Sequence, residues 1–350
     1  MDALATVLER SPEIFPHSLD LRSDSVAFVR LNEADFARAS FLDARVLGRL
    51  TRTLSHPWPQ VEAAVAAAGL AENCDFIFHI GHVGSTLLSR LLGRSKRILA
   101  LREPLILRTL AQMAFEREAG NPAWPADEWE RRTAVFLKLW SRTFRDGQRV
   151  CVKATSFASE IAAQLIRRPS APKALLMALR PESYLATILG GPNSRQEMRI
   201  LAPSRLARLR QRTGSDEWQL ECVSEGEMIA MGWMCEAMAL FAAGQAAPEQ
   251  VRYLDFDQFL ANPAAGLSEA MFHLRGTVDE SEVPAMLSAQ DLRRYSKAPE
   301  HNYDARLRRD VLDQARREHG DEIRRGLVWL DQAASQHSAI RDALNGGLLT

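Results

Sequence analysis

The chain has 350 residues, of which 46% are apolar and 25% are charged, so it can form one large globular domain or two smaller ones. Lysine plus arginine and aspartate plus glutamate number 44 each, and this balance argues against a dedicated nucleic-acid binder. The sequence has no long apolar run and no basic-then-apolar N-terminus, so we expect neither a membrane span nor a secretory signal. The four cysteines show no CxxC pair and no metal-ligand spacing, which favours free, buried thiols and a cytoplasmic protein.

Residues 1–70 are predicted to form an N-terminal flank of mostly helical or irregular structure. Several prolines interrupt this segment, and an alanine-rich helix is expected over 61–70. The pattern changes at Asp75 into short apolar runs that alternate with helical periodicity. Residues 71–345 are therefore predicted to form one α/β domain.

Five short apolar runs in this domain predict buried strands, at 76–80, 98–101, 150–152, 174–179 and 251–254. Helices are expected over 87–92, 105–116, 129–144, after 156, from 182, and over 196–211, 216–243, 304–318 and 321–336. This alternation predicts a three-layer α/β/α fold with a mainly parallel sheet and helical additions. Because ligands of such sheets bind beyond the carboxyl ends of the strands, the polar residues that follow the strands are the first candidates for a functional site.

The segment Gly81–Thr86 joins the first of these strands to a helix. The N-terminus of a helix has unpaired N–H groups and a positive dipole end, and both attract an anion. Gly81 and Gly84 let the backbone curl around phosphate oxygens, while Ser85 and Thr86 are expected to add hydroxyls and to cap the helix. The turn predicts a phosphate or sulfate site; the alternative is a turn that only caps a buried helix.

This turn differs from the ATP-type loop GxxxxGK[ST]. Its glycines are three positions apart, and Ser85 rather than lysine follows Gly84. The lysine and the magnesium-binding hydroxyl are central to nucleoside triphosphate chemistry. An ATP-dependent P-loop kinase is therefore the less favoured alternative.

The turn resembles the P-loop of sulfotransferases, which reads roughly Arg/Lys-Ser-Gly-Thr-Thr-Leu-Leu after a strand. Gly84, Thr86 and the two leucines that follow match it, whereas His82 stands where the family has a cation. The resemblance is to tyrosylprotein and related bacterial sulfotransferases, and it covers roughly residues 75–300. It implies a P-loop fold that uses 3′-phosphoadenosine 5′-phosphosulfate (PAPS) as co-substrate, held by Gly81, His82, Val83, Gly84, Ser85 and Thr86.

The resemblance also assigns roles to residues downstream of the turn. Glu103, in Leu-Arg-Glu-Pro after the second strand, takes the place of the family's catalytic carboxylate. Lys153 takes the place of a lysine that ends the next strand. Arg180 and Thr187 resemble the pair that holds the 3′-phosphate of the co-substrate. Ser296 and Lys297 resemble a C-terminal basic segment that closes over the nucleotide.

Each of these positions also has a structural explanation. Glu103 could simply begin a helix, Lys153 could be a solvated strand end, and Arg180 could pair with Glu182 or cap a helix. Thr187 could be an ordinary helical residue. His79, within the first strand, is expected to be a hydrogen-bonded core residue.

The resemblance implies transfer of a sulfuryl group from PAPS to a hydroxyl or amine acceptor. Glu103 is the expected base, with Lys153 and the turn stabilising the leaving phosphate and His82 as a further catalytic candidate. This chemistry needs no metal. The alternative, prompted by His82, is an inactive sulfotransferase-like module that binds a nucleotide or a partner. The acceptor could be a small molecule, a carbohydrate or a peptide, and the sequence determines neither it nor the oligomeric state.

Overall fold

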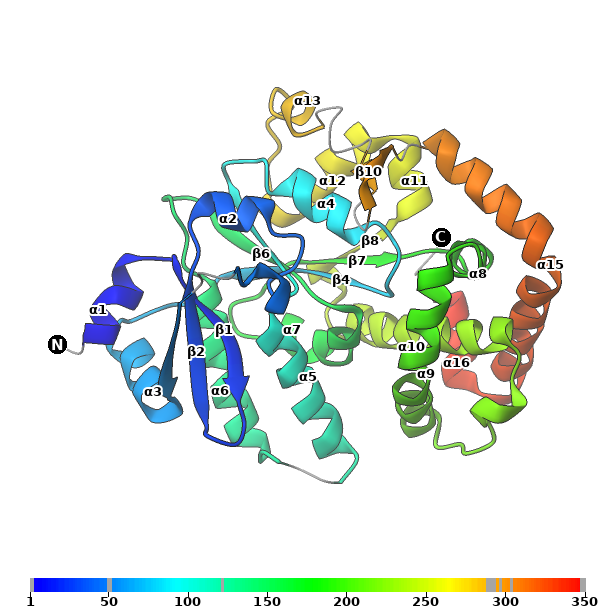
Figure 1. Cartoon of the computed structure of the whole chain (residues 1–350), viewed down its shortest axis with the longest axis horizontal. Coiled ribbons are helices and arrows are strands. Elements are labelled where there is room, and N and C mark those ends of the chain that lie inside the picture. The colour runs from blue at the N-terminus through cyan, green and yellow to red at the C-terminus, as the bar shows by residue number, and fades with distance from the viewer. Residues whose placement is uncertain are drawn as a thin grey trace.

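A computed structural model describes residues 3–48, 52–120, 123–287, 294–295, 298–302 and 305–346 (Figure 1). At its centre lies a five-stranded parallel sheet of order β5-β6-β4-β7-β8. The strands are β4 (Cys74–His79), β5 (Ile98–Arg102), β6 (Arg149–Lys153), β7 (Ala174–Ala178) and β8 (Val251–Asp255). All five predicted strands are therefore confirmed, and so is the α/β class.

Helices cover both faces of this sheet. Figure 1 shows α4, α11 and α12 on one side and α5, α6, α7 and α10 on the other, which gives the three layers predicted from the sequence. The helices of this part of the chain are α4 (Ser85–Leu92), α5 (Leu105–Glu118), α6 (Ala126–Trp140), α7 (Ala162–Ile166), α8 (Pro181–Leu189), α9 (Pro192–Thr213), α10 (Glu225–Ala246), α11 (Phe256–Ala261), α12 (Pro263–Arg275), α13 (Val283–Met286), α15 (Ala305–Gln336) and α16 (Ser338–Asn345). A short ribbon, β9 (Arg294–Tyr295) with β10 (Ala298–Asn302), precedes α15.

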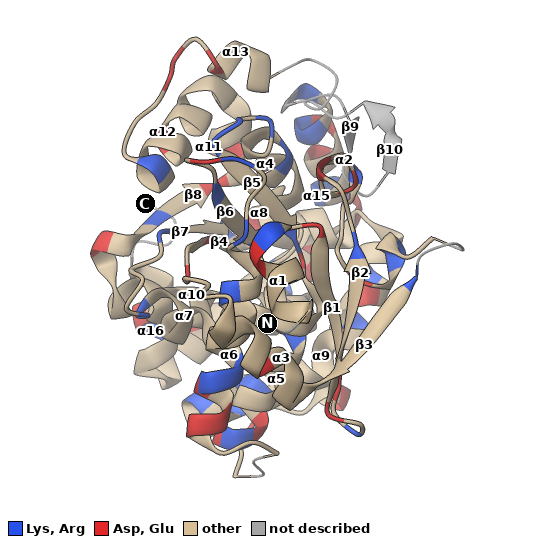
Figure 2. Ribbon diagram, turned by 90° about the vertical axis from the view of Figure 1, so that its left-hand side faces the viewer, with Lys and Arg blue, Asp and Glu red and all other residues tan. Residues whose placement is uncertain are grey.

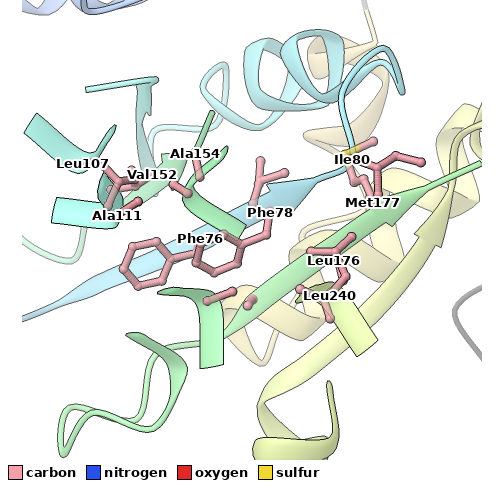
Figure 3. Packing of buried hydrophobic residues seen from close by; sticks show 14 of the residues in the cluster. Phe76, Phe78, Ile80, Leu107, Ala111, Val152, Ala154, Leu176, Met177 and Leu240 are labelled. Atoms are coloured by element: carbon pink, nitrogen blue, oxygen red, sulfur yellow. The ribbon is translucent and has the colours of Figure 1, made fainter. Parts of the chain in front are cut away.

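The core is built around the central strands, because β4, β5 and β7 are buried at every position. Phe76 and Phe78 of β4 stack with ring centroids 5.2 Å apart. Leu107 from α5 and Leu240 from α10 belong to the same buried cluster (Figure 3). Strands buried on both faces need near-continuous apolar runs, which is why the sequence showed them so clearly.

The N-terminal flank contains a three-stranded antiparallel sheet that we did not anticipate from the sequence. Its other described residues are helical or irregular, in line with the expectation for this segment. Alternating burial along the second strand, with Val26 and Phe28 inside, is the strand signal in this region. Pro16 is tolerated because the pairing of the first two strands shifts register beside it. The elements of the flank are α1 (Ala3–Arg10), β1 (Ile14–Asp20), β2 (Ser25–Arg30), α2 (Glu33–Arg38), a 3₁₀ turn (Ala44–Val46), β3 (Thr53–Pro57) and α3 (Trp58–Ala67). Further 3₁₀ turns lie outside the flank, at Ser156–Ile161, Leu220–Cys222 and Pro248–Gln250.

The two helices expected over 304–318 and 321–336 are both present within α15, which has a kink between them where the backbone of His319 is non-helical. Two other expectations need correction. The helix expected over 216–243 begins only at Glu225, because Ser224 and Glu227 form a reciprocal capping box there. Cys222 is exposed, whereas the other three cysteines are buried, and all four are free.

Candidate active site

The segment between β4 and α4 forms a tight loop of left-handed backbone. Gly81, His82 and Gly84 have φ angles of 87°, 55° and 67°. Residues other than glycine rarely adopt this conformation, so His82 is held in it by its surroundings. Successive turns of this kind aim backbone N–H groups into a shared concavity that suits an anion.

The start of α4 is open rather than capped. Gly84 occupies the N-cap position and provides no side-chain hydrogen bond, so the expectation that Ser85 or Thr86 caps the helix is wrong. Both hydroxyl-bearing residues lie inside the first turn and are buried. The first N–H groups of α4 therefore have no side-chain cap, and a bound anion would satisfy them.

His79 is a buried, hydrogen-bonded residue, as expected, and it holds the loop in place. The N–H of Gly81 donates to Nδ1 of His79 over 3.0 Å, and Nε2 lies 2.8 Å from the carbonyl oxygen of Ala154. An Nδ1 that accepts and an Nε2 that donates define one neutral tautomer. These two hydrogen bonds connect the Gly81–Thr86 loop to the turn that follows β6.

Glu103 and Lys153 meet at the carboxyl ends of neighbouring strands. β5 and β6 pair in register up to Arg102 and Lys153, and the N–H of Glu103 donates to the carbonyl of Lys153 over 2.7 Å. The Lys153 ammonium forms an ion pair with Oε1 of Glu103. Its side chain is 2% exposed, whereas that of Glu103 is 19% exposed. The carboxylate is thus the more accessible member of the pair.

A cavity of about 1130 Å³ brings these groups together. Its lining includes all six residues from Gly81 to Thr86 as well as Glu103 and Lys153. A second cavity of about 730 Å³ adjoins it. The residues that line both are Arg45, Glu103, Thr155, Ser156, Asn193 and Glu197. Glu103 therefore stands at the junction of the two cavities.

His82 lies at this site but is engaged with α9. Its Nε2 is 3.3 Å from Oε2 of Glu197, and its Nδ1 is 3.4 Å from the hydroxyl of Ser194. Only 3% of its side chain is exposed. His82 thus connects the loop to α9 through a carboxylate.

Arg180 and Thr187 do not line the two cavities. Arg180 is exposed at the N-cap of α8, just after β7, and it does not line either cavity. Thr187 lies on α8, where its hydroxyl donates to the carbonyl of Ser183 over 2.6 Å. Ser296 and Lys297 lie outside the described residues. The structure therefore brings together the loop, Glu103 and Lys153, and it leaves the other four as predictions.

Some lining residues were not identified from the sequence. Thr155 and Ser156 follow β6 directly, and their place after a strand could have marked them. Asn193 and Glu197 come from α9, where no local pattern distinguishes them. Arg45 comes from the N-terminal flank, which is not part of the parallel sheet, so the strand-end rule cannot reach it.

Two further properties concern the described part of the chain. No three or more histidine, cysteine, aspartate or glutamate side chains gather there in a way that could hold a metal ion. None of its helices combines the length and apolar character required to span a bilayer. Basic and acidic residues are interspersed along the ribbon (Figure 2), in line with the zero net charge.

Comparisons with known proteins give limited similarity. No protein-family model matches the sequence, and no curated protein matches it. Among solved structures, the sulfotransferase domain from the curacin biosynthetic pathway has a TM-score of 0.40 and 14% identity, covering 70% of this chain and 90% of that one. A sulfotransferase from Alicyclobacillus acidocaldarius has a TM-score of 0.35 and 16% identity, covering 63% and 90%. Because both the TM-scores and the sequence identities are low, we draw the α/β class from the sheet of this chain and its chemistry from the cavity.

Proposed function

We propose that the protein transfers a sulfuryl group from PAPS to a hydroxyl or amine acceptor. The observation that carries this proposal is the meeting of three features in one cavity: a helix start without a side-chain cap, a loop of left-handed backbone and the Glu103–Lys153 pair. The loop has no lysine of the ATP type, which favours a sulfated rather than a triphosphate donor. The sequence resemblance to sulfotransferases supports the same choice.

The loop would hold the 5′-phosphosulfate end of the donor. The N–H groups of residues 82–86 and the hydroxyl of Thr86 would donate to its phosphate oxygens, and the buried Lys153, which lines the same cavity, would add a positive charge. Arg180 with Thr187 is retained as the proposed 3′-phosphate site, and Ser296 with Lys297 as the proposed closing segment. No metal ion has a role in this proposal.

The chemical step moves a sulfuryl group between two oxygens when the acceptor is an alcohol. The acceptor oxygen forms a new bond to sulfur, and the bond from sulfur to the bridging oxygen breaks. That oxygen keeps the electron pair and leaves as the phosphate of adenosine 3′,5′-bisphosphate. The acceptor proton passes to the Glu103 carboxylate. Lys153 and the loop stabilise the charge that grows on the leaving oxygen, by analogy with phosphoryl transfer.

The second cavity is the proposed acceptor site. Its lining includes the apolar residues Leu105, Phe157, Ile200 and Leu201 as well as charged ones, and Glu103 stands where it meets the cavity that contains the loop. An acceptor in the second cavity would thus present its hydroxyl or amine to the carboxylate while the donor occupies the first. This arrangement explains why the base belongs to both cavities.

Replacing Glu103 tests the proposal. Glu103→Gln keeps the size and hydrogen bonding of the side chain but cannot take the proton, so turnover should fall about 100-fold or more. Binding of adenosine 3′,5′-bisphosphate should change by no more than about twofold, a small free-energy difference. The assay supplies PAPS with phenols, sugars, amines and tyrosine peptides and measures bisphosphate release. Wild-type turnover in the variant would show that Glu103 only begins a helix.

The second candidate is an inactive module that binds the nucleotide but transfers nothing. Its supporting observation is His82, which pairs with Glu197 where the family places a cation. Tight bisphosphate binding without sulfuryl transfer to any acceptor class would favour this candidate. Sulfated product with any one of them would exclude it.

A further inference from the structure

The segment that follows α2 in the N-terminal flank is anchored to the end of β5. Arg102, the last residue of β5, is buried and donates to the carbonyls of Phe36, Ala37 and Ala39. In return, the N–H of Leu42 donates to the carbonyl of Arg102 over 2.7 Å. These bonds satisfy the carbonyls at the end of α2 and set the position of the chain that follows.

Arg45 is held in place by two neighbours in this segment. Its guanidinium lies 3.5 Å from the centre of the Phe41 ring, and the Lys153 ammonium lies 5.6 Å from the same ring centre. Asp43 accepts from Nε of Arg45 over 2.8 Å and also pairs with Nη2. Within the described part of the chain, Nη1 of Arg45 makes no hydrogen bond, so it remains available to a ligand.

Arg45 stands at the junction of the two cavities. It lines both of them, together with Glu103, and 59% of its side chain is exposed. The hydrogen bond to Asp43 raises the pKa of Arg45, and the charges of Glu103 and Glu197 add to that increase. The guanidinium is therefore a permanent positive charge within electrostatic reach of the proposed base.

The other arginines that line these cavities reach only one of them: Arg108, Arg205 and Arg208 line the second cavity alone. Arg30 and Arg38 line only the first cavity, and each is strongly exposed and paired with a carboxylate of its own surroundings. If the donor binds in the first cavity and the acceptor in the second, the transferred group has to cross the junction between them. Arg45 is the arginine of the N-terminal flank that lines this junction. The position of Arg45 therefore favours a contact with the transferred group over a contact with the nucleotide.

We propose that Arg45 binds the non-bridging oxygens of the sulfuryl group, so that the N-terminal flank completes the active site. This inference rests on the proposed function. Nη1 and the remaining Nη2 proton would donate to the sulfuryl oxygens, as guanidinium groups do with planar or tetrahedral oxyanions. The Phe41 ring and Asp43 keep the guanidinium oriented before the donor arrives.

A comparison of two nucleotides tests this assignment, because PAPS carries the sulfuryl group and adenosine 3′,5′-bisphosphate lacks it. In calorimetric titrations, Arg45→Ala should weaken PAPS binding about 10- to 100-fold, the range of a charge-assisted hydrogen bond. Bisphosphate binding should change by about twofold or less. Phe41→Leu should produce a smaller, about two- to fivefold loss, again for PAPS alone.

Arg22→Ala is the matched control. Arg22 lies in the turn after β1, lines neither cavity, and its replacement removes the same charge from the same flank. It should leave both affinities unchanged, whereas an equal loss of PAPS binding there would show a general electrostatic effect and overturn the assignment. An Arg45→Ala protein that loses both nucleotides equally, or neither, would also overturn it. If the wild-type protein binds the bisphosphate and only the Arg45 result fails, the proposed function stands; if the wild type binds neither nucleotide, both fall.

Discussion

Two regions line the cavity that contains the Gly81–Thr86 loop, and they are built in different ways. The Gly81–Thr86 loop offers backbone N–H groups at the end of a buried strand, fixed by His79 below it. The 36–48 segment offers side chains in exposed ion pairs, such as Arg45 with Asp43, and is held by one buried arginine. The function of the loop therefore depends on its backbone, whereas that of the segment depends on individual side chains. Substitutions should therefore have different consequences in the two regions.

The largest effect is expected from Gly84→Ala in the loop. An added Cβ would overlap the ring of Phe256, which is buried and follows β8. The backbone there is also left-handed, which costs an L-residue roughly 1–2 kcal/mol. Together with overpacking, we expect a loss of about 4 kcal/mol in the free energy of unfolding and no measurable nucleotide binding. Urea denaturation and calorimetric titration measure the two effects.

Gly214→Ala supplies the matched control for that variant. Gly214 has the same φ of 67°, but nothing lies within 4 Å of its added Cβ. It should lose only the backbone contribution, about 1–2 kcal/mol, and keep nucleotide binding. Equal losses in the two variants would show that contact with Phe256 is irrelevant to the loop.

The second prediction concerns the anchor of the segment. Arg102→Met removes the donors to three carbonyls of the 36–39 backbone and leaves those acceptors without their partner. We expect a loss of about 3 kcal/mol in stability, because hydrogen bonds from a buried charged group are among the stronger ones. Adenosine 3′,5′-bisphosphate should still bind, since the loop is built independently. Loss of bisphosphate binding in a folded variant would contradict the separation of the two regions.

The difference between the two regions also explains which features could be predicted from the sequence. Runs such as Phe76–Ile80 are apolar throughout, so the buried strands and the convergence of Gly81, Glu103 and Lys153 at their ends were predictable. The antiparallel flank has short strands of partial alternation, and its contact with the site depends on Arg102, whose role is visible only in three dimensions. The engagement of His82 with Glu197 on α9 is likewise a tertiary contact.

The smallest effect is expected at the amino end of the sheet, away from both regions. Burial lowers the pKa of His273 below its usual 6.5, while its Nε2 lies 3.2 Å from the carbonyls of Ala174 and Gln250. The unfolded chain then binds this proton at a higher pH than the folded one. The stability associated with neutral His273 is therefore present above pH 6.5 and is lost as the pH falls from there towards the lowered value.

Urea denaturation above and below that pH measures the effect of His273. The wild-type protein should lose more stability on acidification than His273→Gln, which has no proton to take up at this position. If the free energy of unfolding has the same pH dependence in both proteins, His273 does not contribute to it. Nucleotide binding by His273→Gln should match that of the wild type, because α12 does not line the two cavities that contain Glu103.

The central claim is that the cavity beside the Gly81–Thr86 loop is built for a sulfuryl-transfer nucleotide without a metal ion. Calorimetric titration of adenosine 3′,5′-bisphosphate into the wild-type protein, in buffer with a chelator, tests it most directly. We expect saturable one-to-one binding in the micromolar range, about −8 kcal/mol, that magnesium does not strengthen. A folded protein that shows no binding at millimolar bisphosphate, or that binds ATP only with magnesium, would contradict the claim.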